Sequence, residues 1–350
     1  MTDIQSICIM RLSAIGDCCH TLAVIRTLQK EIPEASITWI IGKVEASLMS
    51  GLDGVELIVY DKKSGRAGRR ELAQALHQRE FDVLLNMHAS WRANRISRLI
   101  RTRQRIGFDK ARARDFQWLF TADRIASQFQ PHVIDGLFGF AEKIGVRQRH
   151  LEWRLPLNDA HHAFAKSTLP DEGPVLAISP CSSNRARNFR NWPIDRFIEA
   201  ANYAQEAFGA HIVVTGGHSA LEAEYAEAIE QGVSEVTNLV GKTTLKELAA
   251  IIQTASAILC PDSGPAHIAT AVNTPVIGLY ATSNPGRTGP YNSDQTVVNR
   301  YPDACRKYLS SEVSALRWGQ RVRHADAMSL IQVADVKQKI DLLFSSNVQR

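Results

Sequence analysis

Short runs of consecutive apolar residues alternate along the chain with longer segments in which apolar residues recur every three or four positions. The runs are typical of strands buried on both faces, and the periodic segments are typical of amphipathic helices. In the first half the pattern predicts strands at residues 6–10, 36–41, 56–60 and 82–87, and helices at 17–31 and 71–79. Alternating strands and helices indicate a parallel sheet covered by helices.

The same order begins again in the second half. It predicts strands at 174–180, 211–215, 235–239, 257–260 and 275–280, with helices at 194–208 and from about residues 220, 245 and 265. A polar segment, 158–173, separates the halves. We therefore predict an α/β fold of two Rossmann-like, doubly wound domains, 1–172 and 173–325, facing a central cleft. A C-terminal helix within 326–350 is expected to pack back on the first domain. Ligands of such sheets bind beyond the carboxyl ends of the strands.

Composition narrows the class of protein. The 350 residues are 45% hydrophobic and 22% charged, which excludes a disordered chain, a collagen-like chain and a coiled coil. No apolar run reaches the roughly 18–20 residues of a membrane-spanning helix, and the N-terminus lacks a signal-peptide core. The six cysteines form no CxxC pair, so neither zinc nor a redox motif is indicated. We expect a cytoplasmic protein with reduced thiols.

The charge is unevenly distributed. Net charge is +5, but residues 61–115 carry 15 basic and six acidic side chains, a local balance of +9, so the remainder sums to −4. A stretch this basic indicates an anionic substrate, a nucleic acid or a membrane surface.

The segment RLSAIGDCCHTL, residues 11–22, follows the first predicted strand and opens a helix. Gly16 suits a tight turn or the close approach of a ligand. Asp17 lies at the helix start, where it is either an N-terminal cap or a carboxylate general base for an attacking hydroxyl. His20, one turn later, is more simply a helix residue. The segment has no GxGxxG fingerprint of dinucleotide-binding proteins.

The segment CPDSGPAHIATA, residues 260–271, is the most informative stretch. A strand ends at Cys260, a turn follows, and Pro265 suits the first position of a helix. Free amides at a helix start bind anions and match a diphosphate. The candidate ligands here are Asp262, Ser263, Gly264 and His267, with Thr282 and Arg287 in the next strand-end loop. An ordinary capped turn is the alternative interpretation.

A third loop, SPCSSNRARNFRNWP at 179–193, is rich in serine and arginine. Arginine recognises phosphate oxygens through paired hydrogen bonds and would stabilise charge on a leaving diphosphate. Ser182, Ser183 and Arg190 are the candidates, and a solvated basic loop is the alternative. Glu222, after the Gly216–Gly217 turn, is either a ribose ligand or a solvent-facing helix residue.

These segments, in this order, resemble glycosyltransferase family 9, the ADP-heptose:lipopolysaccharide heptosyltransferases. The likeness covers roughly residues 6–300 and is nearest to heptosyltransferase I. It places Asp17 at the catalytic-base position, PDSGPAH at the donor signature, and Arg190 where heptosyltransferase I typically has a catalytic lysine. The resemblance implies a GT-B architecture, the donor in the second domain and the acceptor in the first, and inverting transfer with no cofactor and no metal.

The hypothesis that follows is transfer of heptose from ADP-heptose to a Kdo hydroxyl of the lipid A–Kdo inner core. Asp17 would remove the proton of that hydroxyl. The diphosphate would rest on the amides near Ser263 and Gly264 with Arg190 and Thr282, while Glu222 and Thr243 hold the ribose and base. In the basic stretch we assign acceptor binding to Arg66, Arg69, Arg70 and Arg92. The enzyme would be a monomer at the cytoplasmic face of the inner membrane.

Three other functions compete with this hypothesis. A GT-B transferase with a different nucleotide sugar would share every segment described. A nucleic-acid-binding protein would explain the arginines of 92–114, but the neighbouring aromatic residues do not interleave with them and no nucleic-acid module is present. A nicotinamide dehydrogenase is disfavoured by the missing glycine fingerprint.

Overall fold

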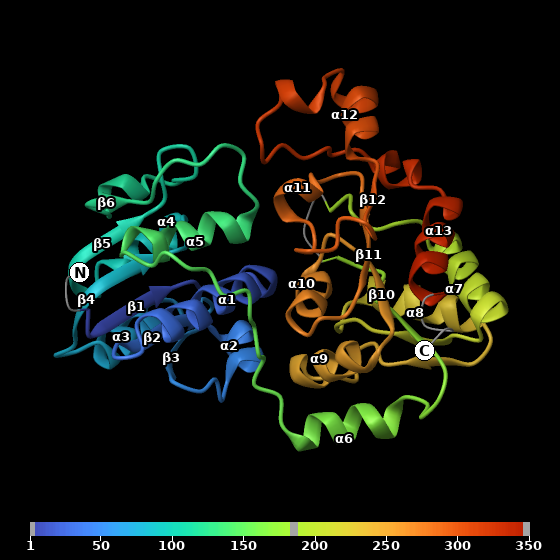
Figure 1. Ribbon diagram of the computed structural model, residues 1–350, viewed down its shortest axis with the longest axis horizontal. Helices are drawn as coiled ribbons and strands as arrows, with labels where there is room; N and C mark the ends of the chain where they lie inside the picture. Colours follow the sequence, from blue (N-terminus) through green and yellow to red (C-terminus); the bar gives the residue numbers. More distant parts are fainter. Residues whose placement is uncertain (1–3, 183–187, 346–350) are drawn as a thin grey trace. The chain divides into compact units, whose positions relative to one another are not determined.

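The computed structural model describes residues 4–182 and 188–345, and its contacts divide the chain into two compact units, Met1–Pro156 and Leu157–Arg350 (Figure 1). Each unit contains one six-stranded sheet whose strands are all parallel. The prediction of two doubly wound parallel sheets is confirmed.

The first sheet has the strand order β3-β2-β1-β4-β5-β6. Its strands are β1 (Ser6–Met10), β2 (Ser36–Gly42), β3 (Val55–Tyr60), β4 (Glu80–Asn86), β5 (Arg101–Gly107) and β6 (Asp123–Arg124). The central strands are buried along almost their whole length, which explains their continuous apolar runs. The polar strand β5 was not predicted from the sequence, and it lies beside β4 toward the edge of the sheet.

The helices of the first unit follow the strands in turn. They are α1 (Ile15–Glu31), α2 (Lys43–Met49), α3 (Gly65–Ala75), α4 (Trp91–Ser97), the short 3-10 helix η1 (Gln117–Leu119) and α5 (Val133–Lys143). Helix α1 has 12 buried residues and packs against α5. The predicted helix at 71–79 lies earlier, at Gly65–Ala75, because Gln78 takes a positive φ of 62° that a helix cannot continue through.

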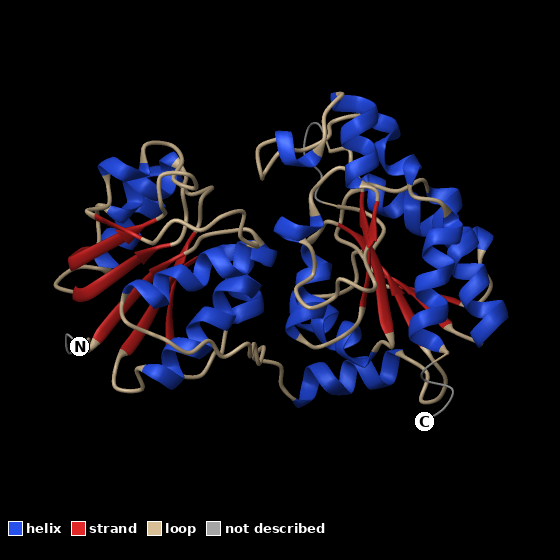
Figure 2. Cartoon of the chain, turned by 45° about the horizontal axis from the view of Figure 1, so that its top comes forward, coloured by secondary structure: helices blue, strands red, loops and turns tan. Residues whose placement is uncertain are grey.

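The second sheet has the order β12-β11-β10-β7-β8-β9. Its strands are β7 (Val175–Ile178), β8 (His211–Val214), β9 (Val236–Asn238), β10 (Ala257–Pro261), β11 (Val276–Tyr280) and β12 (Val298–Asn299). Helices lie on both faces of this sheet (Figure 2). They are α6 (Asp159–Thr168), α7 (Ile194–Phe208), α8 (Ala220–Gly232), α9 (Leu245–Thr254), α10 (Gly264–Ala271), α11 (Pro285–Thr288), α12 (Tyr301–Leu309), the 3-10 helices η2 (Val313–Ala315) and η3 (Ala325–Leu330), and α13 (Val333–Phe344).

Two segments lie differently from the sequence interpretation. Residues 158–173, expected as a linker before a boundary at 172, contain helix α6, which is capped by Asn158 and packs on α9 of the second unit. The C-terminal helix α13 packs on α7, β11 and β12, all within the second unit. Val336, Ile340 and Phe344 of this helix are buried in the core of that unit.

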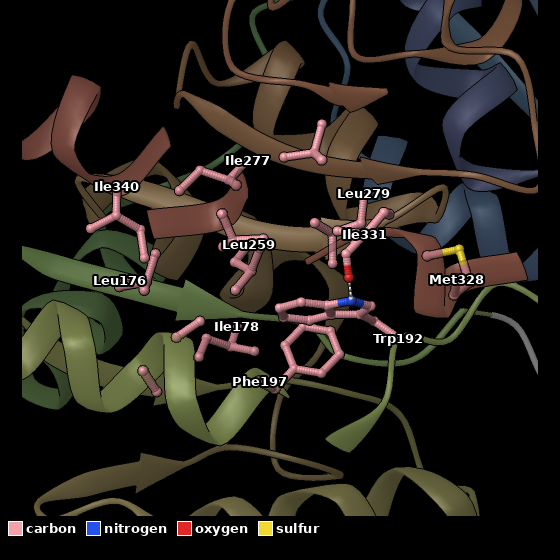
Figure 3. Packing of buried hydrophobic residues seen from close by; sticks show 14 of the residues in the cluster. Leu176, Ile178, Trp192, Phe197, Leu259, Ile277, Leu279, Met328, Ile331 and Ile340 are labelled. Atoms are coloured by element: carbon pink, nitrogen blue, oxygen red, sulfur yellow. Dashed lines mark hydrogen bonds between the residues drawn. The ribbon is translucent and has the colours of Figure 1, made fainter. Parts of the chain in front are cut away.

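Trp192 lies at the centre of this core (Figure 3). It is fully buried, packs edge to face on Phe197 at 5.1 Å between ring centroids, and donates its indole N–H to the carbonyl of Ile331 at 3.1 Å. Arg196 donates to the same carbonyl and to that of Ser329. The start of α7 is thereby fixed to the segment that leads into α13.

Candidate active site

Strand order shows where each sheet forms a ligand crevice. In a doubly wound sheet this crevice lies at the point where the strand order reverses, outside the carboxyl ends of the two strands involved. In the first unit these strands are β1 and β4, and in the second they are β7 and β10. The segments after them are 11–17 and 87–90 in the first unit, and 179–182 and 262–264 in the second.

Asp17 lies at the reversal point of the first sheet. Its carboxylate forms an ion pair with Arg11, which directly follows β1. One oxygen of the carboxylate also accepts from the amide of Ala14 at 3.2 Å, so Asp17 closes the first turn of α1 where the N-cap residue, Ala14, has no polar side chain. The Asp17 side chain is still 31% exposed. The capping interpretation and the catalytic one are therefore compatible, because the cap leaves part of the carboxylate accessible.

His88 lies at the same reversal point, after β4. Its Nδ1 accepts from the amide of Leu12 at 3.2 Å, so the remaining ring proton belongs on Nε2. Burial, with the nearby charges of Arg11, Lys62 and Arg92, lowers the pKa of His88 to about 4. The side chain is a neutral hydrogen-bond donor at physiological pH. Sequence analysis missed His88 because nothing in its local sequence marks it, and the signal appears only once β4 is placed beside β1.

Two further titratable groups interact electrostatically with Asp17. Glu45 of α2 is buried, and its burial raises its pKa, a shift opposed by the nearby charges of Lys62 and Arg11. Cys19 lies two residues after Asp17. Its thiol is buried, and this burial raises its pKa to about 12. All six cysteines are free and buried. His20 is also buried and contacts the His132 ring edge to face, as suits a helix residue.

The four arginines assigned to the acceptor are exposed on two helices. Arg66, Arg69 and Arg70 lie on α3 behind the edge strand β3, and Arg92 lies in the first turn of α4. Arg92 is near enough to lower the pKa of His88, which places it at the reversal point with Asp17.

In the second unit the structure brings Arg190 and Asp262 together. Arg190 Nη1 donates to the backbone carbonyl of Asp262 at 2.7 Å and lies 3.6 Å from its carboxylate Oδ2. Arg321 approaches the same oxygen at 3.9 Å. Asp262 Oδ2 is buried and accepts no hydrogen bond in the described part of the chain, so these two guanidinium groups balance its charge.

Helix α10 begins directly after this pair. Ser263 is its N-cap, Gly264 its first residue and Pro265 its second, so the helix begins one residue earlier than the predicted start at Pro265. The amides of a first helical turn have no partner within the helix and bind anions. His267 and Thr282 are both buried nearby, and the hydroxyls of Ser263 and Ser283 are buried without hydrogen-bond partners among residues 188–345. A buried hydroxyl without a partner calls for an explanation, and a polar ligand bound at this strand end would supply one.

Sequence analysis also missed Arg321. It lies 59 positions after Asp262, in a segment with little periodicity. The structure places it because the amide of Val322 donates to the carbonyl of Thr282 at 2.9 Å, and Tyr301 donates its hydroxyl to the carbonyl of Gln320. These bonds hold the segment against the loop after β11.

Ser182 is buried within a polar network after β7. Its amide donates to Asn191 Oδ1 at 2.9 Å, and its hydroxyl donates to Asn188 Oδ1 at 2.8 Å. Asn188 Oδ1 also accepts from the amide of Arg190 at 3.2 Å, so the network positions the arginine. Ser183, the other serine predicted here, lies outside the described residues.

Glu222 and Thr243 flank adjoining turns. The carboxylate of Glu222 accepts from the amide of Gly217 at 2.7 Å and from both the amide and hydroxyl of Ser219, closing a capping box on α8. The amide of Gly241 donates to the carbonyl of Gly216, which joins this turn to the one that contains Thr243. Glu222 thus shapes the turn. Within the described ranges no group of three or more His, Cys, Asp or Glu side chains is placed to hold a metal ion.

Two doubly wound parallel sheets, each with charged or polar side chains at its reversal point, are typical of two-domain proteins that bind nucleotide-linked or phosphorylated ligands in these crevices. The family model for glycosyltransferase family 9 (heptosyltransferase) matches residues 69–316. The chain is 41% identical over 333 residues to the lipopolysaccharide core heptosyltransferase OpsX of Haemophilus influenzae, covering 95% of each protein. The chain therefore belongs to glycosyltransferase family 9, and it is a glycosyltransferase.

More distant relatives test the predicted likeness to heptosyltransferase I. Lipopolysaccharide heptosyltransferase 1 of Escherichia coli K12 is 22% identical over 305 residues, covering 83% of this chain and 92% of that protein. The expected special likeness to heptosyltransferase I is therefore wrong, because the match to OpsX is much stronger. Among solved structures, a family 9 glycosyl transferase from Veillonella parvula has a TM-score of 0.80 at 20% identity, covering 98% of each chain. E. coli heptosyltransferase WaaC with ADP has a TM-score of 0.75 at 20% identity, covering 97% of this chain and 99% of that one.

Proposed function

We propose that the protein transfers heptose from ADP-heptose to a Kdo hydroxyl of the lipid A–Kdo inner core during lipopolysaccharide synthesis. The observation that carries this proposal is the pairing of Arg190 with Asp262 at the start of α10, a cationic and amide-rich site suited to the diphosphate of a sugar donor. The names of OpsX and of the heptosyltransferase 1 and 3 relatives support heptose as the sugar and lipopolysaccharide as the acceptor class.

The donor half of the mechanism uses the second unit. The diphosphate rests on the amides near Ser263 and Gly264, with Arg190 and Thr282 as further donors. Positive charge fixed at this position stabilises ADP as it leaves, without reorganisation during the reaction. Arg321 adds a second guanidinium at the same carboxylate oxygen of Asp262, and Ser182 and His267 complete the surroundings. Glu222 and Thr243 line the two turns assigned to the ribose and base.

The acceptor half uses the first unit. Asp17 accepts the proton of the Kdo hydroxyl as the oxygen attacks the anomeric carbon from the face opposite ADP, and this single displacement inverts that carbon. Arg11 holds the carboxylate in place. His88 donates to the acceptor through Nε2, and Arg92 binds its acidic groups, with Arg66, Arg69 and Arg70 as a more peripheral set. We place the reaction in the cytoplasm, at the face of the inner membrane.

The test is ADP release by the purified protein. We expect release from ADP-heptose with Kdo-lipid A and little without acceptor, and no activity with UDP- or GDP-sugars. An acceptor that already carries a heptose on Kdo is the second arm, because a heptosyltransferase 3 of E. coli matches the chain at 24% identity over 341 residues. Release only with the heptosylated acceptor would overturn the Kdo assignment and keep the heptosyltransferase. Release only with another nucleotide sugar would overturn the donor.

A further inference from the structure

We propose that an aromatic surface of the first unit, fringed by arginines, binds the face of an anionic lipid bilayer. The surface consists of Trp91, Phe116, Trp118 and Leu119, with Arg92, Arg95, Arg98 and Arg114 beside them. The proposed function is used here for one point only, that the bilayer is the inner membrane. The binding itself is inferred from these side chains.

The apolar side chains of this surface are unusually exposed. Trp91, Phe116, Trp118 and Leu119 are 51–62% accessible, although large apolar side chains are normally buried. They come from two neighbouring segments, since the amide of Trp91 donates to Asp115 Oδ2 at 2.9 Å and its ring contacts Phe120 edge to face. An apolar patch gathered in this way marks a site of interaction with a protein or membrane.

The segment that carries the patch is held rigidly. Gln117, the first residue of η1, is fully buried, accepts from the amide of Phe108 at 3.1 Å and donates to the carbonyl of Asn86 at 3.0 Å. Asn94 of α4 donates to the carbonyl of Asp115 at 2.8 Å. These buried anchors direct the residues on either side of Gln117 outward. The exposure of Phe116, Trp118 and Leu119 is therefore built into the fold at this end of the sheet, beside α4, β5 and β6 (Figure 1).

The charge around the patch is positive and available. Arg92, Arg95, Arg98 and Arg114 are exposed, and none is ion-paired with a carboxylate in the described ranges. By contrast, Arg103 pairs with Asp82, and Arg112 with Asp109. Arg98 also lies over the Phe120 ring at 5.8 Å, which links the basic fringe to the aromatic patch. In a membrane, guanidinium groups that are not ion-paired attract anionic lipid headgroups. The exposed aromatic side chains beside them insert at the boundary between the headgroups and the acyl chains.

This pattern favours a bilayer over a nucleic acid. Tryptophan and phenylalanine partition into the membrane interface, where the indole N–H meets water and the ring meets acyl chains. Leu119, which is 62% exposed, has no ring on which a nucleic-acid base could stack. Transfer of its side chain from water to the acyl chains of a membrane is favourable. No helix within the described residues is long and apolar enough to cross a membrane, so this attachment is to the surface.

The experiment is sedimentation of the full chain with phosphatidylethanolamine–phosphatidylglycerol vesicles and with phosphatidylcholine vesicles. We expect binding to the anionic vesicles that falls at least about tenfold in W118S/L119S, because two interfacial anchors are lost. R95S is expected to lose about fivefold. F116N tests the patch without straining the backbone, because Phe116 has φ of 58°, which asparagine adopts more readily.

The controls separate this surface from general effects. L342S removes a half-exposed leucine of the second unit, and R147S removes an exposed arginine after α5. Both are expected to bind vesicles as the wild type does. Circular dichroism verifies folding of each variant. Wild-type vesicle binding in both W118S/L119S and F116N would overturn the proposal. So would wild-type protein that prefers a single-stranded oligonucleotide to anionic vesicles. Transfer to a delipidated soluble acceptor should survive in W118S/L119S, so loss of docking is distinguishable from a wrong enzymatic assignment.

Discussion

The guanidinium of Arg190 donates to the backbone carbonyl of Asp262 at 2.7 Å, so the loop after β7 is tied to the loop after β10. These loops flank the point at which the second sheet reverses its strand order. A cation held there by the backbone is already oriented before a donor arrives. Preorganised charge of this kind is worth more than a flexible side chain that must be ordered during reaction.

The first prediction concerns that arginine. Arg190→Ala should lower kcat/KM for ADP-heptose by about 10²–10³, the usual loss when one preorganised donor is removed. Arg190→Lys should recover part of the activity, because it retains the charge but not the paired geometry. Steady-state ADP release measures both. Arg306→Ala, which removes an exposed arginine paired with Asp303, is the control. Activity of Arg190→Ala within threefold of wild type would remove Arg190 from the site.

The second prediction concerns Asp17 and Arg11. Asp17→Asn should reduce kcat by about 10²–10⁴, the range attributed to a general base, with little change in donor affinity. Arg11→Ala should lower kcat by a smaller factor, because the carboxylate remains but loses the ion pair that positions it. Donor affinity is measured separately by titration with ADP. Normal turnover in Asp17→Asn would show that Asp17 only caps α1.

The two sheets were predictable because their central strands are continuous apolar runs and their helices have an apolar stripe. Strand β5 was not, since its sequence RTRQRIG is mostly polar and only its pairing with β4 makes it a strand. Helix α6 was taken as part of a linker because it buries only Ala165. Its N-cap, Asn158, was the available signal.

The residues of the candidate site also fall into two groups, those that the sequence could predict and those that it could not. Asp17, Asp262 and Gly264 lie in the loops or helix starts that follow predicted strands, so local sequence marks them. His88, Arg11 and Arg321 depend on which strands are neighbours and on a long return of the chain, neither of which has a local signature.

The third prediction follows from His88. Its pKa is about 4 in the folded protein, against the ordinary value of 6.5, so the unfolded chain binds the proton more readily. The stability that His88 contributes is therefore complete above pH 6.5 and declines as pH falls toward 4. At pH 5 the loss is about 2 kcal/mol. His88→Asn should remove this loss while keeping an acceptor for the Leu12 amide.

The measurement is urea unfolding at pH 7 and pH 5, followed by hydrogen exchange of β1 and β4 so that the first unit is observed separately. The difference between the two pH values should be smaller in His88→Asn than in wild type by about 2 kcal/mol. Comparing differences cancels the contribution of Glu45, whose raised pKa acts in the opposite direction. Equal differences in the two proteins would contradict the buried neutral imidazole.

The last prediction concerns the anchor of the C-terminal helix. Trp192 and Arg196 both donate to the carbonyl of Ile331, so either donor alone keeps that acceptor satisfied. Trp192→Phe should cost about 1–3 kcal/mol from the lost hydrogen bond and a small cavity. Trp91→Phe, at an exposed site, should change stability by less than about 0.5 kcal/mol.

The double variant Trp192→Phe/Arg196→Met distinguishes a shared acceptor from two independent contacts. With both donors gone, the Ile331 carbonyl is left unsatisfied, so the double variant should lose about 1–2 kcal/mol more than the two single losses together. Urea unfolding with hydrogen exchange of α7 and α13 measures this coupling in the second unit. Simple additivity would mean that water replaces the missing donors, and the segment leading into α13 would then be held chiefly by the packing of Met328 and Ile331 in the core.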